Sequence, residues 1–209
     1  IPVLVQRQKN LVNNQLKRIG LYPGFGLYGV NGMSGIVIEA RDETLHPSLA
    51  IQEFGSDSNY VALNKVDSCG YIGIRTDGEY NIVEKNIVNY PMMRLTDGAG
   101  IYSFRHTSHS VFRNNIITHS LGDNESTPKT HPAIALGMYM DGSSYCTITN
   151  NTIAYNTAGL VLNAGSKCHT VRNNVLFGNK ARQLSLPTQR IKFDENYIIT
   201  GNKFFCNEK

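Results

Sequence analysis

Three aspartates, each followed by glycine, are the residues of this sequence whose type best suits chemistry: Asp77, Asp97 and Asp141. Two carboxyl groups can cleave a glycosidic bond together when about 5 to 9.5 Å separates them, one as an acid and the other as a base or nucleophile. Asp-Gly is also a common turn sequence. The elements that carry these aspartates therefore have to be found before a role is given to them.

Those elements form a repeat. The stretches "GMYMDGSSYCTITNNTIAYN" (137–156) and "GLVLNAGSKCHTVRNNVLFGN" (159–179) both run from a glycine through an alternating strand and a polar turn to an asparagine doublet. The shortest intervals between doublets are 22 to 23 residues, a period typical of solenoids. We take the second asparagine of each doublet, or its equivalent, as a marker: Asn14, Asn64, Asn86, Asn115, Asn151, Asn174 and Asn196.

Two positions around each marker are always apolar. Three residues before it stand Leu11, Val61, Val83, Phe112, Ile148, Val171 and Phe193. Two residues after it stand Leu16, Val66, Val88, Ile117, Ile153, Leu176 and Ile198. Such columns stack in one continuous core, and the abundance of Val, Ile, Thr and Tyr favours strands over the helices of a leucine-rich repeat. The sequence therefore predicts an all-β parallel β-solenoid of about seven coils, with asparagines at a corner where their amides bond to those of neighbouring coils.

The strand that follows each glycine should point one set of side chains inward and the other outward. The outward positions form two columns: Val37, Arg75, Tyr102, Tyr139 and Val161, and then Glu39, Asp77, Phe104, Asp141 and Asn163. Since parallel strands lie roughly 4.8 Å apart, Asp77 and Asp141 would be about 10 Å apart, with one coil between them. Tyrosine faces stack well against sugar rings. This stripe therefore predicts a sugar-binding surface.

The repeat resembles the right-handed parallel β-helix proteins of the pectate-lyase-like superfold, from about Gly35 onward. Within it, "DGAGIYSF" (97–104) and "GMYMDGSS" (137–144) are similar to the "DGGAIY" and "GIYLDD" elements of β-helix proteins that include glycoside hydrolase family 141. The resemblance implies that Asp97 and Asp141 are a catalytic pair, although Gly142 replaces the second Asp of "GIYLDD". The two converge only if "LTDG" (95–98) folds back over the strand. Otherwise, Asp141 with Asp77 or Glu39 is the better candidate.

Three insertions, at 41–58, 89–98 and 119–132, are expected to bulge from the corners and to wall the same strands. Basic and imidazole residues lie on or beside the later two, and Arg105, His106 and His131 are the ones we expect to contact substrate. The full set of expected substrate-binding residues is Glu39, Arg75, Asp77, Tyr102, Arg105, His106, His131 and Tyr139.

The expected function is hydrolysis of a plant or microbial polysaccharide outside the cell, by a secreted, periplasmic or cell-surface protein that needs no cofactor or metal. One alternative is a polysaccharide lyase or epimerase, in which Glu39, Asp77 and Asp141 hold Ca²⁺ and Arg75 or Arg105 is the base. Another is a segment of an adhesin or tailspike that binds glycan without cleaving it.

Composition limits the remaining possibilities. The 209 residues are expected to form one domain (1–209) that is part of a longer chain. Its expected partners are a polysaccharide or oligosaccharide, and further coils from the longer chain or from another subunit. The net charge of +4 is scattered, which argues against nucleic acid, and no apolar run of 18 residues predicts a membrane span. The four cysteines lack metal-ligand spacing. We expect them to be buried free thiols, with a bond between Cys146 and Cys168 as the alternative.

Overall fold

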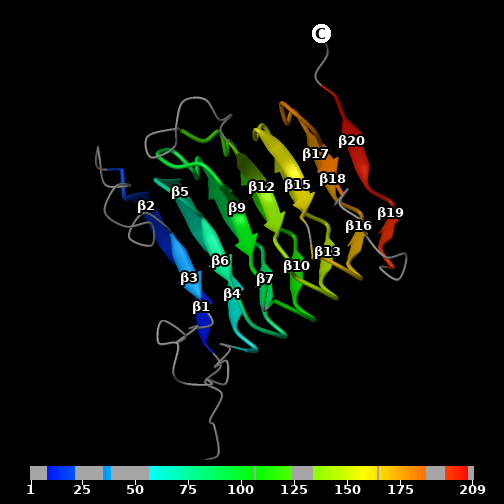
Figure 1. The fold of residues 1–209 in the computed structure, drawn as a ribbon. Coiled ribbons are helices and arrows are strands. Elements are labelled where there is room, and N and C mark those ends of the chain that lie inside the picture. The colour runs from blue at the N-terminus through cyan, green and yellow to red at the C-terminus, as the bar shows by residue number, and fades with distance from the viewer. Residues whose placement is uncertain are drawn as a thin grey trace, which may run out of the picture.

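The computed structural model describes residues 9–21, 35–38, 57–105, 107–123, 134–163, 165–186 and 196–206. These ranges contain twenty strands and no helix, and hence no helix that could cross a membrane. Successive strands join three sheets in turn, so that each coil of the chain adds one strand to each sheet (Figure 1). Neighbouring strands pair in parallel throughout. The predicted all-β parallel β-solenoid of about seven coils is confirmed.

The sheets are named A, B and C here, and their strands follow in stacking order. Sheet A contains β1 (Asn10–Val12), β4 (Tyr60–Ala62), β7 (Ile82–Glu84), β10 (Val111–Arg113), β13 (Thr147–Thr149), β16 (Thr170–Arg172) and β19 (Ile198–Thr200). Sheet B contains β2 (Gln15–Ile19), β5 (Lys65–Cys69), β8 (Ile87–Asn89), β11 (Ile116–Thr118), β14 (Thr152–Ala154), β17 (Val175–Phe177) and β20 (Lys203–Phe205). Sheet C contains β3 (Ile36–Ile38), β6 (Ile74–Thr76), β9 (Gly98–Ser103), β12 (Ala135–Met140), β15 (Ala158–Leu162) and β18 (Leu184–Ser185).

The core lies between the three sheets and is built from the two predicted apolar columns. In sheet A, Phe112 pairs with Val83 on one side and Ile148 on the other. In sheet B, Ile117 pairs with Val88 and Ile153 in the same way. All of these side chains are fully buried. Each coil thus stacks its apolar residues directly on those of the next coil.

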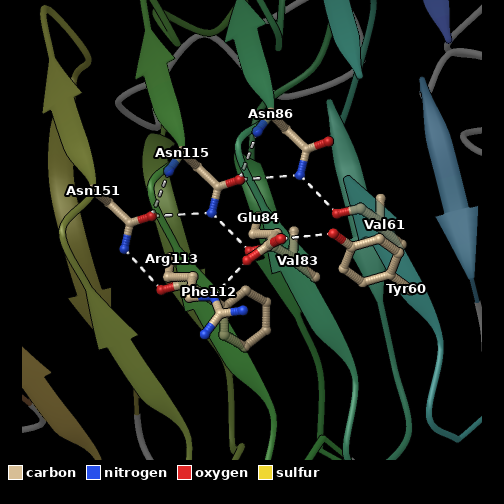
Figure 2. Close-up of polar contacts among 9 residues, drawn as sticks. All are labelled: Tyr60, Val61, Val83, Glu84, Asn86, Phe112, Arg113, Asn115 and Asn151. Carbon is tan, nitrogen blue, oxygen red and sulfur yellow. Dashed lines mark hydrogen bonds and ion pairs between the residues drawn. The ribbon is translucent and has the colours of Figure 1, made fainter. Parts of the chain in front are cut away.

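The two residues of each asparagine doublet have different tasks. The second forms a buried ladder: the Asn115 side-chain oxygen accepts bonds from the backbone and side-chain nitrogens of Asn86, at 3.0 Å each (Figure 2). Its Nδ2 donates to Asn151 Oδ1 at 3.0 Å and to the Val83 carbonyl at 2.9 Å. The first residue takes a left-handed backbone, with φ of 56° at Asn114. The doublet therefore separates turn formation from coil-to-coil bonding.

The last marker, Asn196, is wrong: Asn202 occupies that place. Its Oδ1 accepts bonds from the backbone and side-chain nitrogens of Asn174 at 2.9 Å each. The positions that continue the core columns are Ile199 and Phe204, which pair with Val171 and Leu176 but are exposed in this last coil. Ile198 is also exposed, and Phe193 lies outside the described residues. The missed signal is Gly201, which supplies the left-handed backbone (φ 65°) that an asparagine supplies in other coils.

The prediction that the strands of sheet C begin at the glycines is wrong for β9 and β12. Each of these two strands begins two residues before its glycine. Gly100 and Gly137 are needed for close packing instead. A β-carbon on either glycine would lie 2.3 Å from the isoleucine behind it in sheet B, Ile117 or Ile153. The longer strands increase the distance between residues at their two ends.

All four cysteines are free thiols, as expected, but the expected burial is right only for Cys69 and Cys146. Burial raises the pKa of Cys69 and of Cys146 to about 12. Cys168 is half-buried and Cys206 is exposed. Cys146 is aligned with His169 rather than with Cys168, because its backbone N–H donates to His169 Nδ1 at 3.1 Å. The neighbouring coil therefore does not present Cys168 at the position of Cys146.

Candidate functional site

The predicted stripe lies on the outer side of sheet C. Arg75, Tyr102, Tyr139 and Val161 are in register on neighbouring strands. A second row lies just after the strand ends and contains Asp77, Phe104, Asp141 and Asn163. The Phe104 N–H donates to the Asp77 side chain. The Asp141 N–H donates to the Ser103 carbonyl, and the Asn163 N–H donates to the Met140 carbonyl. We call these two rows the sheet C face: Arg75, Tyr102, Tyr139 and Val161 with Asp77, Phe104, Asp141 and Asn163.

Asp141 is the best-oriented carboxylate of the sheet C face. Tyr102 donates its hydroxyl to Asp141 Oδ2 at 2.9 Å. Asn163 Nδ2 lies 2.9 Å from Asp141 Oδ1 and 2.7 Å from the Tyr139 hydroxyl oxygen. Both carboxylate oxygens thus accept a bond from a neutral donor, while the residue remains partly exposed. This arrangement suits an ionised carboxylate held in one orientation.

The two tyrosines beside Asp141 are hydrogen-bonding groups rather than bases. Burial raises the pKa of Tyr102 well above its usual range, and the Asp141 carboxylate raises it further. Burial likewise raises the pKa of Tyr139, with added effects from the charges of Asp141 and Asp97. Their ring centroids lie 5.3 Å apart at an interplanar angle of 65°. Both therefore stay protonated at neutral pH, and their hydroxyls are bonded to Asp141 and Asn163, with Tyr102 half-buried and Tyr139 buried.

Arg75 is a fixed cation at the next position of the stripe. It forms an ion pair with Asp77 at 2.8 Å, and Asp77 also accepts the Phe104 N–H at 3.2 Å. The Arg75 guanidinium lies 5.6 Å from the Tyr102 ring centroid and 5.8 Å from that of Phe104. Arg105, which is exposed, lies over the same Phe104 ring at 5.3 Å. These contacts hold a positive charge beside the tyrosines, while Asp77 itself is buried.

Asp97 lies at the opposite end of the strand. It is exposed, has φ of 60°, and its backbone contacts Ile134 and the Tyr71 hydroxyl. The six residues of β9 stand between Asp97 and the row of Asp141, which at 3.3 Å per residue is about 20 Å along the backbone. The charge of Asp97 nevertheless acts on Tyr139, as that of Asp141 does. The segment 95–98 does not fold back over the strand, and the two aspartates do not converge in this structure.

Some predicted site residues cannot be placed, and some contributors were not predicted. Glu39, His106 and His131 lie outside the described residues. Asn163 was placed in the outward column without a role, although its alignment with Asp141 was a usable signal. Tyr71 was missed, because it precedes the strand pattern from which the columns were read. Within the described ranges, no group of three His, Cys, Asp or Glu residues could hold a metal ion.

The fold agrees with a comparison of the sequence with protein-family models. A family model for the right-handed β-helix region matches residues 94–204, more than half of the chain. No curated protein matches the sequence.

Proposed function

Since this chain belongs to the right-handed β-helix family, we propose that it is a carbohydrate-active enzyme that hydrolyses glycosidic bonds of a polysaccharide on the sheet C face. Domains of this family occur in pectate lyases, glycosidases and adhesins. The observation that carries the proposal is the orientation of Asp141 by Tyr102 and Asn163 beside the Tyr139 ring. A fixed carboxylate beside aromatic rings and a cation matches the needs of sugar recognition and acid–base chemistry.

Asp141 is the proposed base or nucleophile. Two neutral donors already occupy one site on each of its oxygens, so the carboxylate can accept a proton from water or attack the anomeric carbon without first turning. Tyr102 provides an aromatic surface for a sugar ring, and the nearby Arg75 can donate to sugar hydroxyls. Such a substrate would place the protein outside the cell, as a secreted, periplasmic or cell-surface protein.

Asp97 is the proposed acid partner, and it has to approach Asp141 when substrate binds. A separation of about 5 to 5.5 Å would give retention of configuration, and about 6.5 to 9.5 Å would give inversion. Catalytic contacts often tighten only in the complex with substrate. For this approach, the segment 95–98 would have to release the Asp97 N–H from the Ile134 carbonyl and Gly98 from its pairing with Ala135.

Release of sugar ends from a panel of polysaccharides tests the proposal. We expect Asp141→Asn and Asp97→Asn each to reduce hydrolysis by at least about 100-fold, as loss of a general acid or base does. Asp67→Asn is the matched control, because Asp67 lies on the outer side of sheet B, and it should retain full activity. Hydrolysis that survives Asp141→Asn would rule out the proposed site.

Glycan binding without cleavage is the second candidate, favoured by the six-residue strand between Asp97 and Asp141. It predicts binding that Tyr102→Ala weakens, with no product from any polysaccharide. The lyase alternative has less support at Arg75, which is engaged with Asp77, and its other candidate base is Arg105, which is exposed over the Phe104 ring. An unsaturated product whose formation stops when a chelator is added would establish the lyase instead.

A further inference from the structure

We propose that the outer side of sheet A binds an acidic polysaccharide through Arg113 and Arg172. This surface is formed by different strands from the sheet C face and contains none of its residues. The proposal goes beyond hydrolysis, because it concerns how the protein holds a charged glycan and not how it cleaves one.

The two arginines occupy one outward column. Arg113 on β10 pairs with Thr149 on β13, which pairs with Arg172 on β16. Two strand spacings separate the arginines, about 10 Å at the backbone. Both residues are exposed. The column therefore presents two cations along the solenoid axis with a neutral hydroxyl between them.

Arg113 is held in place by a buried carboxylate. Its Nε donates to Glu84 Oε2 at 2.5 Å, and the Tyr60 hydroxyl donates to Glu84 Oε1 at 2.6 Å (Figure 2). Glu84 is only 5% exposed, and the bonds from Tyr60 and Arg113 lower its pKa despite its burial. The bonds of Arg113 to described residues use Nε alone, whereas its side chain is 45% exposed. The Glu84 contact thus fixes the orientation of the Arg113 guanidinium and leaves its two terminal nitrogens to donate to a ligand.

The surroundings of the two arginines are neutral and polar. Thr147, Thr149 and Thr170 point outward around them and are half-buried, and Asn150 and Asn173 are exposed at the following corner. No Asp or Glu occurs on β10, β13, β16 or β19, or next to these strands in the chain. The acid beside them is Glu84 on β7, which is buried and already bonded to Arg113, so a ligand carboxylate would meet the two arginines among hydroxyl and amide groups.

An aromatic column borders this surface. Tyr80, His109 and Tyr145 stack across three coils, with centroid separations of 5.2 and 5.0 Å and interplanar angles of 24° and 9°. The column ends at Tyr145, because Cys168 takes that corner in the next coil. Tyr145 lies two residues before β13 and is 49% exposed. It provides a rigid ring edge against which a sugar can pack.

The spacing of charge favours an acidic glycan over nucleic acid. Duplex DNA carries a charge every 1.7 Å or so along its axis, and single strands are bound in basic grooves with several stacking rings. Here a threonine separates the two arginines, and the three rings of the aromatic column stack on one another. Such sparse cations among hydroxyl-binding groups suit a uronic acid polymer, whose charges are spaced by sugar rings.

Binding of alginate, measured by calorimetry in the Asp141→Asn background so that nothing is cleaved, tests the proposal. Arg113→Gln with Arg172→Gln should weaken binding about tenfold, in line with two exposed ion pairs. The matched control is Lys65→Gln with Lys203→Gln, which removes the same charge from the outer side of sheet B and should leave affinity unchanged. Added salt should weaken binding through screening, and neutral dextran should not compete.

Several outcomes would overturn the proposal. Equal losses in the two double variants would mean attraction by net charge alone, and single-stranded DNA that binds as tightly as alginate would point to nucleic acid. Arg172→Gln alone should weaken binding about threefold, and because Arg172 is exposed this variant keeps the test valid if loss of the Arg113 contact to Glu84 unfolds the chain. Hydrolysis is not measured here, so failure of this proposal leaves the proposed enzyme intact, and the reverse also holds.

Discussion

Replacement of Asn115 by alanine should strongly destabilise the solenoid. Asn115 is fully buried, and its side chain makes four hydrogen bonds. Two of these come from Asn86, one goes to Asn151 and one to the Val83 carbonyl. The truncation would therefore interrupt the ladder at its middle coil.

The size of the effect follows from these contacts. Without the Asn115 oxygen, the buried Asn86 backbone N–H loses its partner, which costs about 1 to 3 kcal/mol. The three other bonds contribute about 1 kcal/mol each. We therefore expect Asn115→Ala to lower the free energy of unfolding by about 4 to 6 kcal/mol.

The neighbouring Asn114 provides the control. It is exposed and has a left-handed backbone that glycine adopts without strain, so Asn114→Gly should change the free energy of unfolding by less than about 1 kcal/mol. Urea unfolding followed by circular dichroism measures both variants. The explanation of the doublet would be refuted if Asn115→Ala cost under about 1 kcal/mol, or if Asn114→Gly cost more than Asn115→Ala.

Three further predictions concern the core, pH and the thiols. Phe112→Ala should lower the unfolding free energy by about 3 to 5 kcal/mol, and a near-zero change would place this side chain outside the core. Burial lowers the pKa of His169 to about 4, so the unfolded chain binds its proton first, and stability should fall by about 3 kcal/mol as the pH drops from 6.5 to 4. Asn59 and Asn81 occupy the position of His169 in two earlier coils, so His169→Asn should fold and should lose less stability over this pH range. An unchanged dependence of stability on pH would contradict the assignment of the decline to His169. A thiol reagent should label Cys206 quickly in the native protein and Cys146 only after unfolding, whereas early labelling of Cys146 would contradict its burial.

Most of the fold could be predicted because the same pattern of residues recurs in successive coils. Val83, Phe112 and Ile148 hold the same place in successive coils, so the pattern does not depend on any single residue. The prediction failed in the last coil, where an asparagine before the strand resembled the marker. The true marker there follows Gly201, and only the backbone shows that glycine and asparagine are interchangeable at that corner.

The site could be predicted only in part, because strand alternation determines direction but not side-chain contacts. It aligned Arg75, Tyr102 and Tyr139 correctly. It could not show that Asn163 holds Asp141, since amide contacts depend on rotamers. It also could not show whether 95–98 folds back over the strand, and the structure places Gly98 of that segment in β9 instead.

A crystal structure of the Asp141→Asn variant with an oligosaccharide of its substrate would test the proposed enzyme most directly. The account predicts a sugar packed on Tyr102, with the glycosidic bond beside position 141 and the Asp97 carboxyl within about 10 Å of it. An oligosaccharide bound away from the sheet C face, or an Asp97 carboxyl that stays farther than about 10 Å when the sugar is bound, would contradict it.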